Sequence, residues 1–187
     1  MQTRIELPGG IYQHISNTRV KLNRSERSVV DWAMVDDHQS VLELSCEQDR
    51  LINYYQSQYH IRACGLCFDI ELAQQLRSSL ERAEIMSSMN GDIPWQSDSF
   101  NRILMSNALP YYLSLQEFLS EIYRVLAPGG KLVLALPSIN IYRHQLSFKS
   151  DTSIWKQFLL QLEKTGFKDV SCNRTRFIQR CLIAYKH

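Results

Sequence analysis

The sequence predicts an α/β fold, a doubly wound and mostly parallel sheet with an antiparallel hairpin at its C-terminal edge. From residue 41 onward, short apolar runs alternate with amphipathic stretches of ten or more residues, as right-handed strand–helix–strand units require. The last two apolar runs are separated by only a few polar residues, which favours a hairpin. A chain of 187 residues fits one domain with one core.

The N-terminal half begins with an irregular lead-in, followed by a helix at 25–36. Ser25 can accept the free amide hydrogens of the first turn, and Val29, Ala33 and their neighbours follow helical spacing. A short apolar strand is expected at 41–44, a helix at 49–58 and a strand at 61–68. Residues 70–83 form a helix by propensity, with Leu72, Leu76 and Leu80 on one face.

The C-terminal half begins with the turn-rich stretch "NGDIPWQSDSF", after which we expect a strand at 102–109 and an amphipathic helix at 115–126. Pro128 cannot continue that helix, and Gly129 and Gly130 tolerate the positive φ of a turn. A strand at 131–136, a helix at 153–165 and final strands at 167–172 and 177–185 complete the order. We divide the single domain into a lead-in and helix (1–40), a core (41–138) and a C-terminal helix with edge strands (139–187).

Composition narrows the classes of function and partner. The net charge of +2 is too small to favour a nucleic-acid partner. No run of about eighteen apolar residues suggests a membrane span, and "MQTRIELPGG" lacks the apolar core of a signal peptide, so a cytoplasmic location is expected. Five cysteines without framework spacing suit reduced thiols, and neither a disulfide nor a metal site is assigned.

A longer pattern spans residues 91–138, "GDIPWQSDSFNRILMSNALPYYLSLQEFLSEIYRVLAPGGKLVLALPS". It resembles class I S-adenosylmethionine-dependent methyltransferases, in the branch containing the ubiquinone and menaquinone enzymes. Residues 92–100 match the family's "D-L-P-F-x-D-x-S-F-D", and residues 124–134 match "R-V-L-K-P-G-G" and the strand after it. The resemblance covers residues 41–138. It implies a Rossmann-like, seven-stranded sheet and S-adenosylmethionine as cofactor, bound near the "VLELSCEQD" stretch at the end of the first sheet strand.

The chain departs from the family at the residues that hold the cofactor. Against the family loop "D-L-G-C-G-T-G", Ser45, Glu47 and Asp49 replace the glycines. The acid that binds the ribose hydroxyls falls on Cys67, and the acid that contacts the adenine falls on Met89. The candidate cofactor-binding residues are Glu43, Ser45, Cys46, Glu47, Asp49, Cys67, Phe68, Met89, Asn90 and Asn107. No residue is assigned a catalytic role.

Of these departures, the negative charge of Glu47 should weaken cofactor binding the most. A carboxylate of Glu47 within about 4 Å of the cofactor's carboxylate would cost about 4 kcal/mol at an effective dielectric of about 20. Glu47 must therefore face solvent, pair with a base such as Arg50, or exclude the ligand. Asp49 fits the N-cap of the following helix, where its carboxylate would take the electrostatic place of the ligand.

The "CGLC" stretch at 64–67 offers a separate interpretation, as a redox or half-zinc motif. Residues three apart in a strand face opposite sides of a sheet, so Cys64 and Cys67 are predicted not to converge.

Two hypotheses about function follow. The first is a methyltransferase that transfers the activated methyl group to an unidentified small-molecule acceptor. The second is a noncatalytic scaffold or partner subunit that keeps the fold after losing the cofactor, motivated by the joint loss of the loop glycines and of both acids. The sequence leaves open a protein partner and a homodimer.

Overall fold

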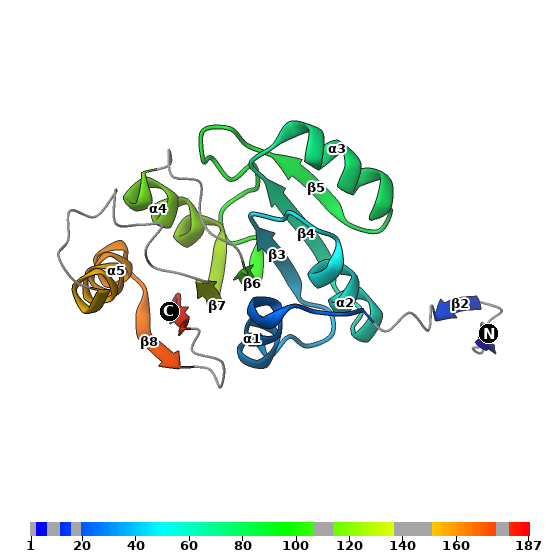
Figure 1. Cartoon of the computed structure of the whole chain (residues 1–187), viewed down its shortest axis with the longest axis horizontal. Helices are drawn as coiled ribbons and strands as arrows, with labels where there is room; N and C mark the ends of the chain where they lie inside the picture. Colours follow the sequence, from blue (N-terminus) through cyan, green and yellow to red (C-terminus); the bar gives the residue numbers. More distant parts are fainter. Residues whose placement is uncertain (1–2, 7–11, 16–19, 107–113, 137–150, 175–179) are drawn as a thin grey trace.

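The computed structural model describes residues 3–6, 12–15, 20–106, 114–136, 151–174 and 180–187. A seven-stranded sheet forms the body of the molecule, in the order β5-β4-β3-β6-β7-β9-β8 (Figure 1). Its strands are β3 (Ser40–Leu44), β4 (Arg62–Cys67), β5 (Glu84–Ser87), β6 (Phe100–Met105), β7 (Leu126–Leu136), β8 (Lys168–Arg174) and β9 (Arg180–Tyr185). The helices are α1 (Arg24–Ala33), α2 (Arg50–Gln58), α3 (Ile70–Ser79), α4 (Leu115–Val125) and α5 (Asp151–Thr165).

The pairing of the strands confirms the predicted fold class. Strands β5, β4, β3, β6 and β7 pair in parallel, and β7, β9 and β8 pair antiparallel. From β3 the chain runs outward to β4 and β5, then returns to place β6 on the other side of β3. This reversal puts a topological switch between β3 and β6, and open sheets of this kind bind ligands beyond the carboxyl ends of the strands at such a point.

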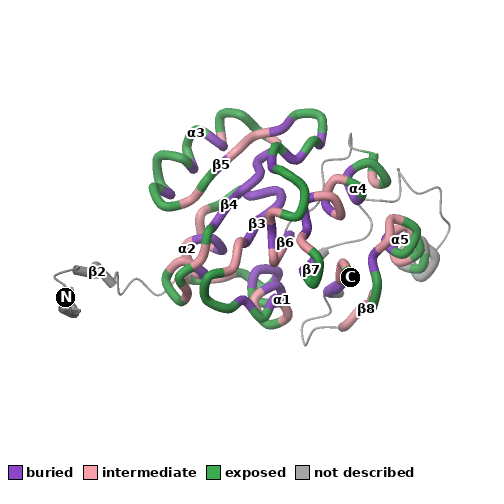
Figure 2. Tube along the Cα trace, turned by 180° about the vertical axis from the view of Figure 1, so that it is seen from behind, coloured by how far each residue is buried: buried purple, intermediate pink, exposed green. Residues whose placement is uncertain are grey.

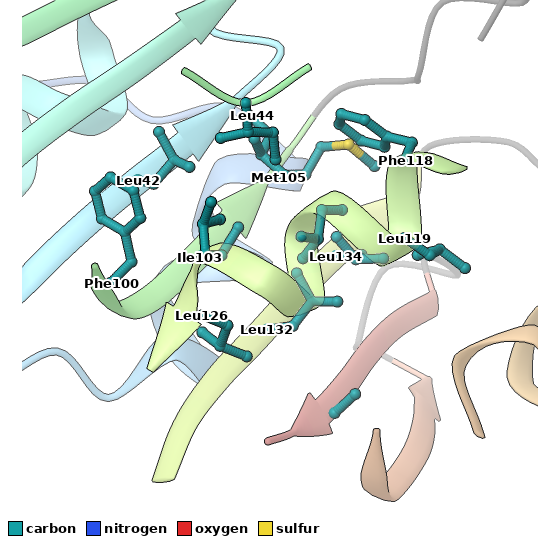
Figure 3. Packing of buried hydrophobic residues seen from close by; sticks show 14 of the residues in the cluster. Leu42, Leu44, Phe100, Ile103, Met105, Phe118, Leu119, Leu126, Leu132 and Leu134 are labelled. Atoms are coloured by element: carbon teal, nitrogen blue, oxygen red, sulfur yellow. The ribbon is translucent and has the colours of Figure 1, made fainter. Parts of the chain in front are cut away.

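Helices cover both faces of the sheet because its central strands are apolar on both sides. On one face, Val41 and Leu104 pack with residues of α1 and α2, while Ala63 packs with α3. On the other face, the apolar side chains of β3, β6 and β7 meet those of α4 (Figure 3). Figure 2 shows the resulting pattern, with buried strands in the centre and an exposed outer surface on α3. None of the helices in the described ranges is long and apolar enough to cross a bilayer.

The N-terminal region differs from the expectation in two ways. The lead-in contains an antiparallel hairpin of β1 (Thr3–Glu6) and β2 (Tyr12–Ile15). Helix α1 begins one residue early, because Asn23 rather than Ser25 is its N-cap. Asn23 and Glu26 exchange side-chain to backbone hydrogen bonds of 2.8 and 2.6 Å, forming a capping box.

Two further differences concern strands. The short strand β5 lies in a stretch where no strand was expected from periodicity, and it pairs with β4 through residues such as Ile85. Strand β7 begins at Leu126, directly after α4, so the "APGG" turn lies inside its bounds. Of the two glycines there, Gly129 has a φ of 75°, whereas Gly130 is required by crowding, since a Cβ would lie 2.6 Å from the Ala127 carbonyl oxygen.

Candidate functional site

The predicted cofactor residues lie where three neighbouring strands end. Ser45, Cys46, Glu47 and Asp49 follow β3 in the β3–α2 loop, which we define as residues 45–49. Cys67 and Phe68 lie at the end of β4, and Met89 and Asn90 follow β5. Because β3, β4 and β5 are adjacent and parallel, the topology brings these residues to one edge of the sheet. Asn107 falls outside the described residues.

The β3–α2 loop makes the turn that glycine would make, without glycine. Ser45 is buried and adopts the left-handed conformation, with a φ of 54°. That conformation costs an ordinary residue about 1 to 2 kcal/mol, so the surrounding fold must hold the turn in place. One restraint is the Cys46 amide, which donates a hydrogen bond of 3.0 Å to the Leu66 carbonyl of β4.

Glu47 is exposed to solvent, which is one of the two arrangements that would allow an anion to bind. Arg50 does not neutralise it, because its guanidinium binds Glu26, at 2.8 Å between Nη2 and Oε1. Glu26 is itself buried in the first turn of α1. The ion pair therefore joins the N-terminal ends of α1 and α2. It was not predicted from the sequence, where only the capping-box spacing of Asn23 and Glu26 draws attention to Glu26.

Asp49 occupies the predicted N-cap position of α2 but forms no side-chain capping hydrogen bond. Its carboxylate accepts a bond of 3.1 Å from the Asn53 side chain instead. The prediction that Asp49 caps the helix in place of a ligand is therefore wrong in its hydrogen bonding. The first-turn N–H groups of α2 lack the acceptor that Asp49 could have supplied, and such groups attract anions.

Glu43 lies beneath the loop with 4% of its surface exposed. Burial, and then the nearby negative charge of Glu26, hold the pKa of Glu43 well above its usual range. The Cys46 Sγ atom is 3.7 Å from its Oε2 atom. Glu43 therefore contributes less negative charge beneath the loop than an ionised carboxylate would.

At the position where the family resemblance predicts the ribose acid, this chain carries a thiol. Cys67 is fully buried, and its Sγ donates to the Cys46 carbonyl oxygen at 3.1 Å. Asp69, the next acid along the chain, caps α3 by accepting a bond of 2.8 Å from the Leu72 amide. The carboxylate of Asp69 is thus engaged by α3, and at the Cys67 position the atom present is sulfur.

The "CGLC" prediction is confirmed by the packing of β4. Cys64 belongs to the apolar cluster beneath α4, and Cys67 belongs to the cluster beneath α3. The two thiols therefore lie on opposite faces of the sheet.

The region predicted to contact the adenine is polar and exposed. Met89 is 59% exposed, and the Asn90 side chain accepts from the Ser88 hydroxyl at 3.0 Å and donates to Asp92. Phe68 lies between this region and α4, in edge-to-face contact with Phe118 at 5.7 Å between ring centroids.

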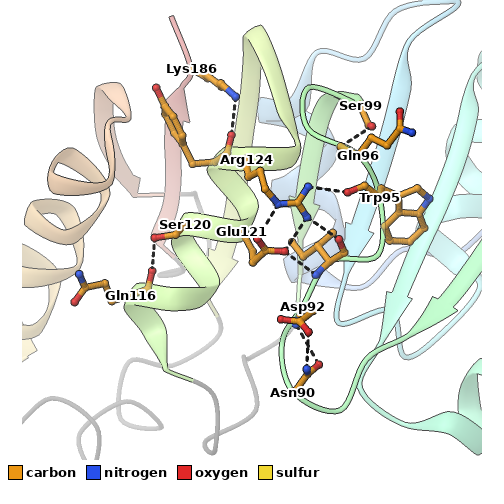
Figure 4. Close-up of polar contacts among 12 residues, drawn as sticks. Asn90, Asp92, Trp95, Gln96, Ser99, Gln116, Ser120, Glu121, Arg124 and Lys186 are labelled. Atoms are coloured by element: carbon orange, nitrogen blue, oxygen red, sulfur yellow. Dashed lines mark hydrogen bonds and ion pairs between the residues drawn. The ribbon is translucent and has the colours of Figure 1, made fainter.

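Two residues of α4 hold the segment after Asn90 against that helix (Figure 4). This contact was not predicted from the sequence. Arg124 donates to the Ile93 and Trp95 carbonyl oxygens, each at 2.8 Å, and to the Glu121 carboxylate. Glu121 in turn accepts from the Ile93 amide at 3.1 Å. We call Glu121 and Arg124 the α4 clamp. Both fall in the stretch that carries the family resemblance.

Comparison with known proteins gives a family and several relatives. The profile of the family described as "Methyltransferase domain" matches residues 42–134. The chain is 25% identical over 118 residues to 2-methyl-6-phytyl-1,4-hydroquinone methyltransferase 1 of Oryza sativa, an alignment covering 57% of this chain and 36% of that protein. It is 47% identical over 45 residues to demethylmenaquinone methyltransferase of Tropheryma whipplei, covering 24% of this chain and 19% of that protein. The chain thus spans about a third or less of these relatives.

Solved structures share the fold over most of the chain. A putative methyltransferase in complex with the Trm112 activator of Haloferax volcanii superposes with a TM-score of 0.70 at 15% identity, over 87% of this chain and 89% of that one. A SAM-dependent methyltransferase from Aquifex aeolicus gives 0.67 at 16% identity, over 90% and 92%. With the strand order and the matched profile, these likenesses lead to one assignment. The chain belongs to the class I S-adenosylmethionine-dependent methyltransferase superfamily.

Proposed function

We propose that the protein binds S-adenosylmethionine at the carboxyl edge of β3, β4 and β5 and transfers its methyl group to a small-molecule acceptor. The observation that carries the proposal is the uncapped first turn of α2. Asp49, at the N-cap, makes no side-chain capping bond, so its carboxylate does not occupy the first-turn N–H donors at this edge.

The residues present fit the amino-acid end of the cofactor. Ser45 supplies the left-handed turn that glycine supplies in the family, and α2 supplies amide donors for a carboxylate. Of the three carboxyl groups near the loop that could repel that carboxylate, Asp49 accepts a hydrogen bond from Asn53, and the other two are kept from the ligand by different means. Glu47 faces solvent, and Glu43 has a raised pKa because it is buried.

The fit is weaker at the ribose. Cys67 offers sulfur where two hydroxyl groups would need a bidentate acceptor, and Asp69 is engaged as a helix cap. A hydroxyl left buried without a partner costs about 1 to 3 kcal/mol. We therefore expect affinity below that of a relative with an acid at this position.

The chemistry asks little of the protein beyond binding. The sulfonium of S-adenosylmethionine carries the methyl group already activated, so the chain's residues need to hold the cofactor, align the acceptor and exclude water. Phe68, which is half-buried and in edge-to-face contact with the buried Phe118, offers an apolar surface beside the site for this purpose.

The second candidate function is a noncatalytic scaffold or partner subunit. It is favoured by the complete burial of Cys67 and by the engagement of Asp69, which together leave the ribose acid unreplaced. The Haloferax volcanii complex gives weak support, because in that structure a methyltransferase of the same fold is bound to an activator protein.

Isothermal titration with S-adenosylmethionine and S-adenosylhomocysteine separates the two functions. Binding in the micromolar range supports the enzyme. No heat at millimolar ligand, with the protein shown to be folded, would favour the scaffold.

A matched pair of variants tests the electrostatic part of the argument. Since Glu47 faces solvent, Glu47→Gln should change affinity by less than about tenfold, or about 1.4 kcal/mol. An increase of about a thousandfold would mean that the carboxylate faces the ligand after all. Glu81→Gln, at an exposed carboxylate after α3, serves as the control.

A further inference from the structure

Two buried thiols meet where the β3–α2 loop joins β4. Cys46 is the second residue of that loop, at its buried end, and Cys67 is the last residue of β4. Both are fully buried, in one apolar cluster with Ile52 and Ile85. They are separated by 21 residues in sequence and lie on different elements, so spacing alone could not pair them.

Hydrogen bonds hold the two residues against each other. The Cys46 amide donates to Leu66, which precedes Cys67, and the Cys67 thiol donates to the Cys46 carbonyl oxygen at 3.1 Å. Interaction between the two side chains also shifts the pKa values of the two thiols in opposite directions. Leu44 pairs with Leu66, so Cys46 lies one residue beyond the position opposite Cys67 on the neighbouring segment, which is about 4.8 Å away. A disulfide spans Cα separations of about 4.4 to 6.8 Å. Gly65 leaves room for the Cys46 sulfur, because a Cβ there would lie 3.3 Å from it.

We propose that Cys46 and Cys67 form a modification site, a dithiol that is reversibly oxidised to a disulfide joining the β3–α2 loop to the end of β4. The oxidant belongs to the class of low-molecular-weight disulfides. The Cys67 thiolate attacks one sulfur of the oxidant and releases the first thiol, which gives a mixed disulfide. The Cys46 sulfur then attacks the Cys67 sulfur and releases the second thiol. Two protein thiols lose two hydrogens, and one oxidant molecule is reduced to two thiols.

The two cysteines have different roles in this exchange. Interaction with the Cys46 side chain lowers the pKa of Cys67, which makes Cys67 the attacking partner. The same interaction, and then burial, raise the pKa of Cys46 well above its usual range, which suits the resolving partner. The cover over the pair is thin, since Glu47 and Gln48, the next residues of the loop, are exposed. A local opening of this loop is enough to admit the oxidant.

The consequence for ligand binding rests on the proposed function. The Cys67 position is where the family places its ribose acid, and Cys46 adjoins the left-handed turn at Ser45. A covalent bond between the two would fix the loop against β4 at the entrance to the nucleoside side. The oxidised protein should therefore bind S-adenosylmethionine more weakly than the reduced protein.

Peptide mapping tests the disulfide without reference to the cofactor. Trypsin leaves Cys46 in the peptide 28–50 and both Cys64 and Cys67 in the peptide 63–77, so a Cys64→Ala background makes the linkage unambiguous. After incubation with oxidised glutathione, we expect these two peptides to be linked and to separate after treatment with dithiothreitol. Recovery of both peptides unlinked, or of a persistent glutathione adduct on Cys67, would overturn the proposal.

Control variants distinguish the pair from general thiol reactivity. Cys67→Ser, on the Cys64→Ala background, should abolish the link while keeping the size of the side chain, and near-ultraviolet circular dichroism checks the fold. Cys181→Ala should retain the link, because Cys181 lies in β9 in a different apolar cluster. Calorimetry on the reduced and oxidised forms then tests the coupling. If the linked peptide forms but the reduced protein binds no cofactor, the proposed function fails and the disulfide stands.

Discussion

Two loops at the same edge of the sheet are held in place by different kinds of contact. The β3–α2 loop has lost the family's glycines and is held by backbone and thiol contacts to β4, around a left-handed Ser45. Residues 92–100, further along the chain after β5, keep the family's pattern, and the α4 clamp holds this segment through bonds from Arg124 to two carbonyl oxygens and to Glu121. One loop departs from the family's sequence but keeps a left-handed turn, and the other segment keeps the family's sequence.

This difference indicates that the sequence pattern typical of the family mainly reflects its fold. Arg124 and Gly130 lie in the stretch that carries the resemblance, and both have structural roles. Arg124 binds a loop to α4, and Gly130 avoids a clash with the backbone. Residues at the predicted cofactor contacts, such as Cys67, are the ones that changed. Recognising the family from residues 92–134 therefore says much about architecture and less about ligand affinity.

The largest effect should come from breaking the α4 clamp. Arg124→Ala leaves the Ile93 and Trp95 carbonyl oxygens and the Glu121 carboxylate without their charged donor. Because hydrogen bonds to charged groups contribute about 1.5 to 3 kcal/mol, we expect a loss of about 3 to 4 kcal/mol in the free energy of unfolding, measured by urea denaturation.

The matched control for the clamp is Arg82→Ala, at an exposed arginine after α3, which should stay within about 0.5 kcal/mol. An equal loss in both variants would show that the clamp adds nothing specific.

The second effect compares a glycine beside each region, Gly65 in β4 next to the β3–α2 loop and Gly130 in β7 just after α4. In Gly130→Ala the new Cβ meets the Ala127 carbonyl oxygen at 2.6 Å, and backbone cannot easily move, so we expect a loss of about 2 to 3 kcal/mol. In Gly65→Ala it meets the Ile85 Cδ1 atom at 2.8 Å, and a flexible side chain can yield, so about 1 kcal/mol is expected. Thermal and urea unfolding measure both, and a larger loss at Gly65 would reverse the comparison.

Hydrophobic periodicity predicted the layers and most of the elements, because burial on a sheet or helix face leaves a direct trace in the order of residues. The sequence EIMS of β5 was missed because it is short and polar at both ends, and it is a strand only through its pairing with β4. The sequence was interpreted with Ser25 at the start of α1, whereas the N-cap is Asn23. The capping-box spacing of Asn23 and Glu26 is the signal that indicates this N-cap.

The site was predicted less fully than the fold, because its contacts join residues distant in sequence. The sequence shows which glycines of the loop are replaced. It does not show the left-handed φ of Ser45 or the exposure of Glu47. The carboxylate of Asp49 was expected to cap α2, yet it binds Asn53, a choice between two local partners that spacing does not decide. The bonding of Cys67 to Cys46 depends on the pairing of β3 with β4.

The third effect is a dependence of stability on pH that originates beneath the β3–α2 loop. Burial raises the pKa of Glu43, so the folded state keeps its proton to higher pH than the unfolded chain, whose value is about 4.3. As pH rises from there toward the raised folded pKa, the folded state binds more protons than the unfolded state, and the free energy of unfolding falls. Glu43→Gln should remove this decline and stabilise the protein by about 1 kcal/mol at about pH 8.

Urea denaturation at several pH values measures this dependence, with Glu81→Gln as the exposed control. If the free energy of unfolding of Glu43→Gln falls with pH as steeply as that of the wild type, the pH dependence comes from other groups.

The smallest effect should be Ser45→Gly, and it tests whether the altered loop truly keeps the family's turn. Glycine relieves the left-handed conformation, which costs serine about 1 to 2 kcal/mol, but it adds about 0.5 to 1 kcal/mol of chain entropy to the unfolded state. The net change in the free energy of unfolding should therefore stay within about 1 kcal/mol. Ser45→Val, a branched residue at a φ of 54°, should lose about 2 kcal/mol in the same urea experiment. Equal stability of the two variants would mean that the backbone at residue 45 is free to leave the left-handed region, and the loop would then lack the fixed turn on which the proposed anion site depends.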